Sequence, residues 1–277
     1  MPDVPHVPGL SPRRAPAVEV EDLGIRYNLR LTKRTTLRGS FAALRRGDHT
    51  PNHFWALRHL NFRLDQGESL AIIGPNGAGK STLLLALAAI LSPSEGEIRT
   101  YGRVSTLLTL GAGFEQQLSG RDNITLVGAF LGMGHDDMMA LAPSIIDFAE
   151  LGPFIDAPVK TYSQGMKARL GFSIATAMVP DILLLDEVLG TGDYAFRARS
   201  QARVRELVER ARAIVLVTHD LTYVTEFCNR ALLIEKGQII SEGDPREVVD
   251  LYRERTEQRK LLAEAEAERF ATIPAVS

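Results

Sequence analysis

The chain has 277 residues, 45% of them hydrophobic, and a net charge of −2 at pH 7. This length suffices for one large domain or two small ones with a sizeable core, and the charge argues against nucleic acid as a partner. The single cysteine, Cys228, excludes an internal disulfide, and the longest apolar run (83–91) is far shorter than the about 20 residues that span a bilayer.

The N-terminal third begins with residues 1–18, which are rich in proline and polar side chains, and we expect them to be disordered. They contain no apolar segment typical of a secretory signal. The alternation in AVEVEDLGIRYN then predicts a first strand. An insertion of about 28–52 is basic, and its stretch TLRGSFAALRR predicts a short amphipathic helix. That helix lies either on its own domain or at a membrane surface or partner, and the sequence leaves both open.

The remaining elements alternate between strands and helices. HFWALRHLNFRLDQGESLAIIG predicts two strands joined at a glycine turn, the second buried in a mostly parallel sheet, and a helix follows from Lys80. A helix-rich insertion occupies about 113–178. Two apolar runs, DILLLDE and AIVLVTHD, predict further buried strands, and RALLIEKGQIISEGD predicts a hairpin. We expect residues 248–277 to form a charged helical tail.

The stretch GPNGAGKST fits the phosphate-loop pattern G-x-x-x-x-G-K-[ST], after a predicted strand and before a predicted helix. Its glycines let the backbone turn N–H groups toward phosphate oxygens, and the helix start adds partial positive charge. The lysine reaches the β- and γ-phosphates, the serine binds Mg²⁺, and the threonine adds a hydroxyl contact. A chance glycine-rich turn is the alternative, which the strand and helix context disfavours. The predicted nucleotide-binding residues of this loop are Gly74, Asn76, Gly77, Gly79, Lys80, Ser81 and Thr82.

Polar residues at the ends of the two later apolar runs predict the catalytic groups. Asp186 ends DILLLD, where it can hold Mg²⁺ through water, and Glu187 follows, placed to polarise an attacking water. His219 lies beyond the next strand, on the ligand side of the sheet, where it could hold the γ-phosphate and the water in line. An acid that merely ends a buried strand and a structural histidine are the alternatives, and the phosphate loop upstream disfavours them.

The order GPNGAGKST, YSQGM, DILLLDE, GTGD, VTHD resembles the nucleotide-binding subunits of ABC transporters over residues 19–247. This resemblance implies a P-loop NTPase fold with a mostly parallel sheet, an antiparallel β subdomain and a helical subdomain. It also implies a head-to-tail dimer with two ATP molecules between two copies. Ser163 and Gly165 would then contact the γ-phosphate across the dimer, and Asp193 would belong to the loop joining the two sites. Tyr27 would stack on adenine, unless it is a core tyrosine at a strand end.

Two departures from the family pattern stand out. The family has a Mg²⁺-binding glutamine before the helical insertion, whereas this chain has threonine or leucine near Thr109, with Gln116 and Gln117 further on. In TYSQGMKARLGF, Gln164 replaces a glycine and Met166 replaces a glutamine. Neither of these positions has to supply the phosphate donor, so we interpret the second departure as a mark of one branch.

That branch is the ATPases that export lipid-linked polysaccharides such as O-antigen, teichoic acid or cell-wall galactan, which the chain resembles in ELGPFIDAPVKTYSQGM and DEVLGTGDYAF. The resemblance implies a peripheral location at the cytoplasmic face of the membrane, on a permease subunit. It also places the basic helix at the membrane, where Arg38, Arg45 and Arg46 suit a lipid pyrophosphate. A transporter for another substrate, a soluble ABC protein acting on ribosomes or chromosomes, and a non-hydrolysing scaffold are the alternatives.

Overall fold

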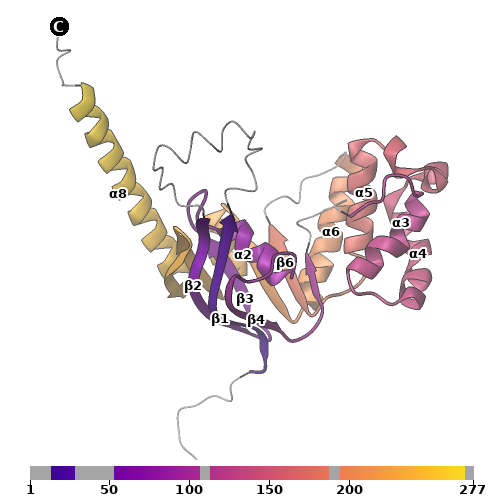
Figure 1. The fold of residues 1–277 in the computed structure, drawn as a ribbon, viewed down its shortest axis with the longest axis horizontal. Coiled ribbons are helices and arrows are strands. Elements are labelled where there is room, and N and C mark those ends of the chain that lie inside the picture. The colour runs from indigo at the N-terminus through magenta and orange to yellow at the C-terminus, as the bar shows by residue number, and fades with distance from the viewer. Residues whose placement is uncertain (1–13, 29–52, 107–112, 187–193, 272–277) are drawn as a thin grey trace, which may run out of the picture.

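The computed structural model describes residues 14–28, 53–106, 113–186 and 194–271 (Figure 1). The amphipathic helix predicted within the basic insertion lies outside these residues, as do its three arginines, Thr109, Glu187 and Asp193. Within the described ranges no helix is long and apolar enough to cross a bilayer.

A three-stranded antiparallel sheet opens the fold, in the order β2-β1-β4. It consists of β1 (Pro16–Asn28), β2 (His53–Asp65) and β4 (Glu95–Thr100). The predicted first strand is confirmed, but the disorder expected for residues 1–18 is wrong at its end. Ala17 and Val18 are 1% exposed, because the alternating pattern already directs apolar side chains into the core there.

The second sheet has six strands in the order β5-β6-β7-β3-β8-β9, all parallel to their neighbours except β9. Its inner strands are apolar on both faces because helices or the first sheet cover each face. The short strands β4 and β5 carry little apolar pattern and were not predicted. The strands are β3 (Ser69–Ile73), β5 (Val104–Thr106), β6 (Ile182–Asp186), β7 (Ala213–Val217), β8 (Arg230–Glu235) and β9 (Gln238–Gly243).

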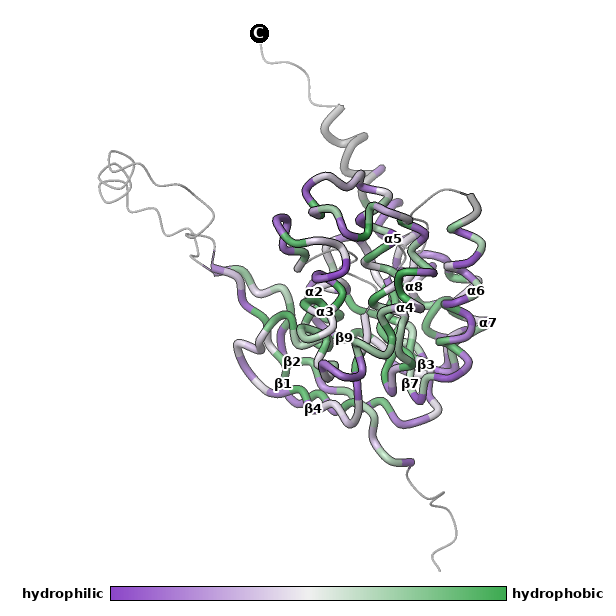
Figure 2. Tube along the Cα trace, turned by 90° about the vertical axis from the view of Figure 1, so that its right-hand side faces the viewer, coloured by the Kyte–Doolittle hydropathy of each residue, from purple (hydrophilic) through white to green (hydrophobic). Residues whose placement is uncertain are grey.

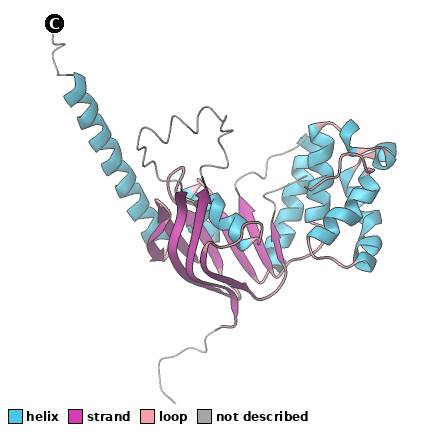
Figure 3. Cartoon of the chain, viewed as in Figure 1, coloured by secondary structure: helices cyan, strands magenta, loops and turns pink. Residues whose placement is uncertain are grey.

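The helices fall into two groups. Between β5 and β6 the chain forms a helical unit beside the sheets (Figure 3), and the other helices pack on the six-stranded sheet. The helical unit comprises α3 (Gly120–Phe130), α4 (His135–Ala149), α5 (Gln164–Ala175) and the 3-10 turns η1 (Gly152–Asp156) and η2 (Val159–Thr161). The helices on the sheet are α2 (Lys80–Leu87), α6 (Tyr194–Arg210), α7 (Leu221–Phe227) and α8 (Pro245–Ala271).

The main core lies between the two sheets and encloses α2, whose Leu83 and Leu84 are 0% exposed. Figure 2 shows hydrophobic residues running through the strands of this interior. Smaller cores hold α7 and α8 on the opposite face of the six-stranded sheet, α6 beside the carboxyl half of α5, and the helical unit itself. The fold class predicted from the sequence, α/β with a mostly parallel sheet and an antiparallel one, is confirmed.

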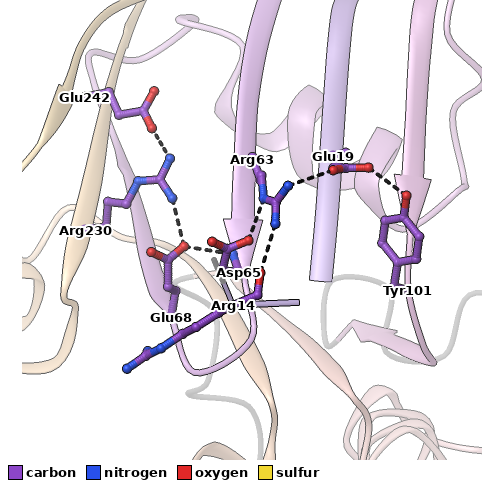
Figure 4. A network of polar contacts seen from close by, with 8 residues as sticks. All are labelled: Arg14, Glu19, Arg63, Asp65, Glu68, Tyr101, Arg230 and Glu242. Atoms are coloured by element: carbon purple, nitrogen blue, oxygen red, sulfur yellow. Dashed lines mark hydrogen bonds and ion pairs between the residues drawn. The ribbon is translucent and has the colours of Figure 1, made fainter. Parts of the chain in front are cut away.

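A polar network joins the two sheets at the end where β3 begins (Figure 4). Arg63 on β2 donates to Asp65 at 2.6 Å and to Glu19 on β1 at 3.2 Å. Arg230 on β8 donates to Glu68 at 2.8 Å, and Glu68 accepts from the backbone N–H of Asp65 at 2.8 Å. Because β3 runs from this end toward the phosphate loop, the network fixes the sheets without entering the candidate site.

The charged tail expected from residue 248 starts earlier and is partly built into the fold. Helix α8 begins at Pro245, and Val248 and Val249 are 1% exposed against the six-stranded sheet. The tail prediction relied on the density of charged residues, which hid this short apolar pair. Cys228 packs on the same cluster, and burial raises the pKa of its thiol to about 11.

Candidate nucleotide-binding site

The phosphate loop connects β3 to α2, as the sequence predicts, and its glycines are required by close backbone contacts. Gly74 has φ +147°, and a Cβ there would lie 2.0 Å from the carbonyl oxygen of Ile234. Gly79 has φ +106°, and its Cβ would lie 2.7 Å from the carbonyl oxygen of Ala56. The loop therefore sits in a cradle formed by β2 and β8, and larger residues would push it out.

A cavity of about 370 Å³ opens above this loop, at the carboxyl end of the central strands. It is lined by Tyr27, Phe54, Ala56, Asn76, Gly77, Ala78, Gly79, Lys80, Ser81, Thr82, Asp186, Val217 and His219. Residues from five separate parts of the sequence thus meet in one place. Gly74 is the one predicted loop residue that does not line the cavity, since it packs against β8 instead.

Lys80 is 7% exposed, and its ammonium group is held within the loop. Its Nζ donates to the carbonyl oxygens of Gly74 at 2.7 Å and Pro75 at 3.0 Å. A buried ammonium group needs such acceptors, and an incoming phosphate would offer it charged oxygens in their place.

Asp186 and His219 reach the cavity because β6 and β7 end level with each other. Asp186 pairs with Val217 in the parallel register, and the chain continues from Val217 through Thr218 to His219. The turn that carries His219 is fixed on both sides. The N–H of Asp220 donates to Thr218 Oγ1 at 3.0 Å, and the Asp220 carboxylate caps α7 by accepting from Thr222 N–H at 3.0 Å.

Two aromatic residues of the antiparallel sheet, Tyr27 and Phe54, also line the cavity and are called its aromatic wall below. Tyr27 and Phe54 are directly paired across β1 and β2, so both rings lie on the same face of that sheet, 39% and 53% exposed. The next pair, Arg26 and Trp55, points to the other face, where the guanidinium lies 5.4 Å from the ring centroid. Phe54 is a cavity residue that sequence reasoning missed, because only the strand register brings it beside Tyr27.

The stretch TYSQGMKARLGF opens α5, in the helical unit and apart from α2 (Figure 1). Ser163 is the N-cap: its Oγ accepts from the N–H of Met166 at 3.2 Å. The backbone at Gly165 is open, with nothing nearer to an added Cβ than Ser163 Oγ at 3.8 Å. Neither residue lines the cavity, so the structure does not bring them together with Lys80 in one chain.

Comparison with known proteins agrees with this geometry. Residues 57–190 match the family model described as ABC transporter. The chain is 43% identical over 188 residues to the O-antigen export system ATP-binding protein of Yersinia enterocolitica, covering 68% of this chain and 79% of that protein. The chain belongs to the ATP-binding proteins of ABC transporters.

Other relatives of this ABC protein are longer. It is 45% identical over 222 residues to an O-antigen export system ATP-binding protein of Myxococcus xanthus, covering 80% of this chain and 50% of that one. Likewise, it is 41% identical over 219 residues to a teichoic acids export ATP-binding protein of Lactococcus lactis, covering 79% and 47%. The chain thus spans about half the length of these two relatives.

Solved structures support the ABC cassette fold. The dimeric post-hydrolysis state of an ATP-binding cassette bound to ADP and Pi has a TM-score of 0.59 and 20% identity, covering 82% of this chain and 98% of that one. At this level of identity the likeness establishes the fold alone.

The two glutamines considered for the Mg²⁺-binding role of the ABC family are engaged elsewhere. Gln116 Oε1 accepts from Lys167 Nζ on α5 at 2.9 Å, and Gln117 Oε1 accepts from Lys160 Nζ at 2.8 Å. Neither side chain lines the cavity. In this ABC protein Gln116 ties the segment before α3 to α5, and Gln117 ties it to η2, the turn that precedes α5.

The side chains present fit a magnesium ion bound together with a nucleotide. Ser81 and Asp186 both line the cavity and offer a hydroxyl and a carboxylate oxygen, the hard ligands that Mg²⁺ prefers. Among the described residues there is no group of at least three acidic, histidine or cysteine side chains that could hold a metal by itself. Phosphate and water oxygens would therefore have to complete the coordination shell, as is usual for Mg²⁺ in nucleotide sites.

Proposed function

We propose that this chain is the ATP-hydrolysing subunit of an ABC transporter that exports a lipid-linked polysaccharide. The observation that carries the ATPase proposal is the cavity in which Lys80, Asp186 and His219 converge from three separate strand ends. Phosphoryl transfer depends on positioning and on neutralising the negative charge of the phosphates, and this cavity supplies groups for both.

Each group has a distinct role in this proposal. Lys80 and the loop N–H groups neutralise the β- and γ-phosphates, and His219 orients the γ-phosphate toward the attacking water. Glu187, adjacent to Asp186 in sequence, polarises that water. Bound Mg²⁺, held by Ser81 and through water by Asp186, would add positive charge at the phosphate oxygens. Tyr27 stacks on adenine.

The same proposal requires a second copy of the chain. Ser163 and Gly165 present a hydroxyl and an open backbone at a helix start, a favourable place for a phosphate, yet they lie outside the cavity. A head-to-tail dimer would bring these groups of one copy to the phosphate loop of the other. Asp193 would lie in the loop that joins the two sites.

Polysaccharide export is supported by the names of the relatives, which are O-antigen and teichoic acids export proteins. The basic segment 28–52 supports a membrane-facing role, with Arg38, Arg45 and Arg46 contacting a lipid pyrophosphate. We propose a peripheral location at the cytoplasmic face, on an integral membrane permease. A transporter for another substrate remains the alternative.

ATP turnover tests the enzymatic part of the proposal. We expect Glu187→Gln to lower turnover about 100-fold or more while nucleotide binding persists, because only the water-polarising group is lost. Lys80→Ala should weaken binding itself. Equal turnover by wild type and Glu187→Gln would leave a non-hydrolysing scaffold as the better description.

The export substrate needs a separate test in the complex with the permease. Replacing Arg38, Arg45 and Arg46 together by Ala should reduce stimulation of ATPase activity by a lipid-linked polysaccharide but leave basal turnover intact. Unchanged stimulation would refute the proposed contact with the pyrophosphate. Stimulation by an unrelated substrate alone would favour a different transporter.

A further inference from the structure

The end of β8 and the turn between β8 and β9 each touch the phosphate loop. The carbonyl oxygen of Ile234 packs against Gly74, where even a Cβ would lie only 2.0 Å away. The N–H of Gly237 donates to the carbonyl oxygen of Ala78 at 3.0 Å. A shift of the end of β8 together with this turn would therefore disturb both the start and the middle of the phosphate loop.

The turn is too tight to absorb such a shift by itself. Lys236 and Gly237 both have positive φ, +49° and +77°, which is the conformation of a two-residue hairpin turn. The carbonyl oxygen of Gly237 accepts from the N–H of Arg58 on β2 at 2.9 Å. The turn is thus hydrogen-bonded to β2 on one side and to the phosphate loop on the other.

Glu235, the last residue of β8, connects this turn to the C-terminal helix α8. Along β8, side chains alternate between the two faces of the sheet, so Glu235 shares the face of Leu233, which packs with α7 and α8. The Glu235 side chain is 12% exposed. Arg255 donates to both of its carboxylate oxygens at 3.0 Å, and Arg259 donates to one of them. Glu235, Arg255 and Arg259 are called the Glu235 cluster below.

Helical geometry explains why these arginines face β8. Val248, Tyr252, Arg255 and Arg259 follow the spacing of one helix face, and Val248 is 1% exposed against the sheet. The apolar first turns of α8 anchor the helix, and the arginines further along the same face reach the end of β8. Beyond them α8 runs away from the body of the fold (Figure 1), with Leu261 60% exposed.

We propose that Glu235 is a positioning residue for the nucleotide. Its ion pairs with α8 hold the β8–β9 turn against the phosphate loop, and through this contact the C-terminal helix sets the affinity for the phosphates. Bidentate arginine–carboxylate pairs are strong and geometrically specific, which suits such a link. Because coupling between two sites is reciprocal, nucleotide binding strengthens the attachment of α8 equally.

This inference rests on the proposed nucleotide site and adds an input to it from the C-terminal helix. A purely structural role for the Glu235 cluster would change stability alone. A positioning role changes the affinity for nucleotide, and it raises KM more than it changes kcat. Asp186 and His219, at the ends of β6 and β7, are not in the turn and keep their places.

Equilibrium binding of ADP to the full chain, measured by titration calorimetry, tests the link. We expect Glu235→Gln and the double change Arg255→Gln with Arg259→Gln each to raise Kd about fivefold, the lower end of typical coupling between sites. The steady-state KM for ATP should rise by a similar factor with kcat little changed. Arg255→Lys, which keeps the charge, should recover part of the affinity.

Arg253→Gln is the matched control, because Arg253 is an exposed arginine on the same helix whose ion pair, with Asp250 at 3.4 Å, stays within α8. Its Kd should equal that of wild type. Wild-type affinity in the Glu235-cluster variants, or an equal loss in the control, would overturn the inference alone. Failure of the wild type to bind ADP would overturn the proposed function, and with it this inference.

Discussion

Removing the ring of Phe54 tests whether the aromatic wall of the cavity recognises the base of the nucleotide. Phe54 and Tyr27 are paired across two strands and line the same cavity. The two residues are 53% and 39% exposed, so both are accessible to a ligand. The Phe54→Ala change removes one of these rings without altering the sequence of the phosphate loop.

The expected loss follows from the energy of stacking. Contact between a base and an aromatic side chain contributes about 1–3 kcal/mol by alanine substitution. If two rings share one base, each contributes less, so we expect the lower end, about 1 kcal/mol for Phe54, which is roughly a fivefold rise in Kd for ATP. The double change with Tyr27→Ala should lose more than either single change.

The assay compares two ligands that share phosphates and differ in the base. Binding of ATP and of inorganic tripolyphosphate is measured by calorimetry on the same variants. Phe54→Ala should weaken ATP binding and leave tripolyphosphate binding unchanged. Phe154→Ala serves as the control, because that ring is 55% exposed like Phe54 but lies on η1 in the helical unit.

Two results would refute the reasoning. Unchanged ATP affinity in Phe54→Ala would show that the ring does not meet the base. An equal loss of tripolyphosphate affinity would show instead that the change disturbs the loop and says nothing about base recognition.

Three further predictions concern stability and local order. Asp220→Ala removes the cap of α7 beside His219, so it should lower the unfolding free energy by about 1 kcal/mol and also lower ATP turnover. Asp220→Asn can still cap the helix and should keep both the stability and the turnover. Equal losses in the two variants would contradict the capping argument. Leu84→Ala, in the core around α2, should lower the unfolding free energy by about 2–5 kcal/mol in denaturant titrations, against little change for exposed Leu261→Ala. The hydrogen bond from Arg255 lowers the pKa of Glu235 from its ordinary value of 4.5. The charged Glu235 therefore stabilises the fold above about pH 4.5, and this contribution disappears as the pH falls through the lowered pKa. The difference in unfolding free energy between wild type and Glu235→Gln should consequently shrink on acidification. A difference that does not depend on pH would contradict this prediction.

Much of the candidate site could be predicted from the sequence because its chemistry is local. The phosphate loop, Asp186 and His219 each follow a short apolar run, and the carboxyl ends of parallel strands meet at one edge of a sheet. The hairpin at Lys236 and Gly237 is local in the same sense, since two residues determine its turn. These patterns can be recognised without knowing which strands are neighbours.

Other features depend on contacts between distant segments. Phe54 is separated from Tyr27 by the basic insertion, and only the register of β1 on β2 makes the two rings one wall. The strands β4 and β5 are short and carry weak apolar patterns, so their partners, rather than their sequences, define them. The C-terminal helix begins at Pro245 and not at the predicted residue 248, and its first turns belong to the fold because Val248 and Val249 pack on the sheet.

The sequence by itself thus determined the fold class and most of the residues that line the candidate site, since strand ends, glycines and a lysine at fixed spacing suffice for both. Only the tertiary structure decided what surrounds them. It placed Ser163 outside the cavity, paired Phe54 with Tyr27, and joined Glu235 to Arg255 across 20 residues. Side-chain neighbours of this kind follow from packing and register, which no local pattern encodes.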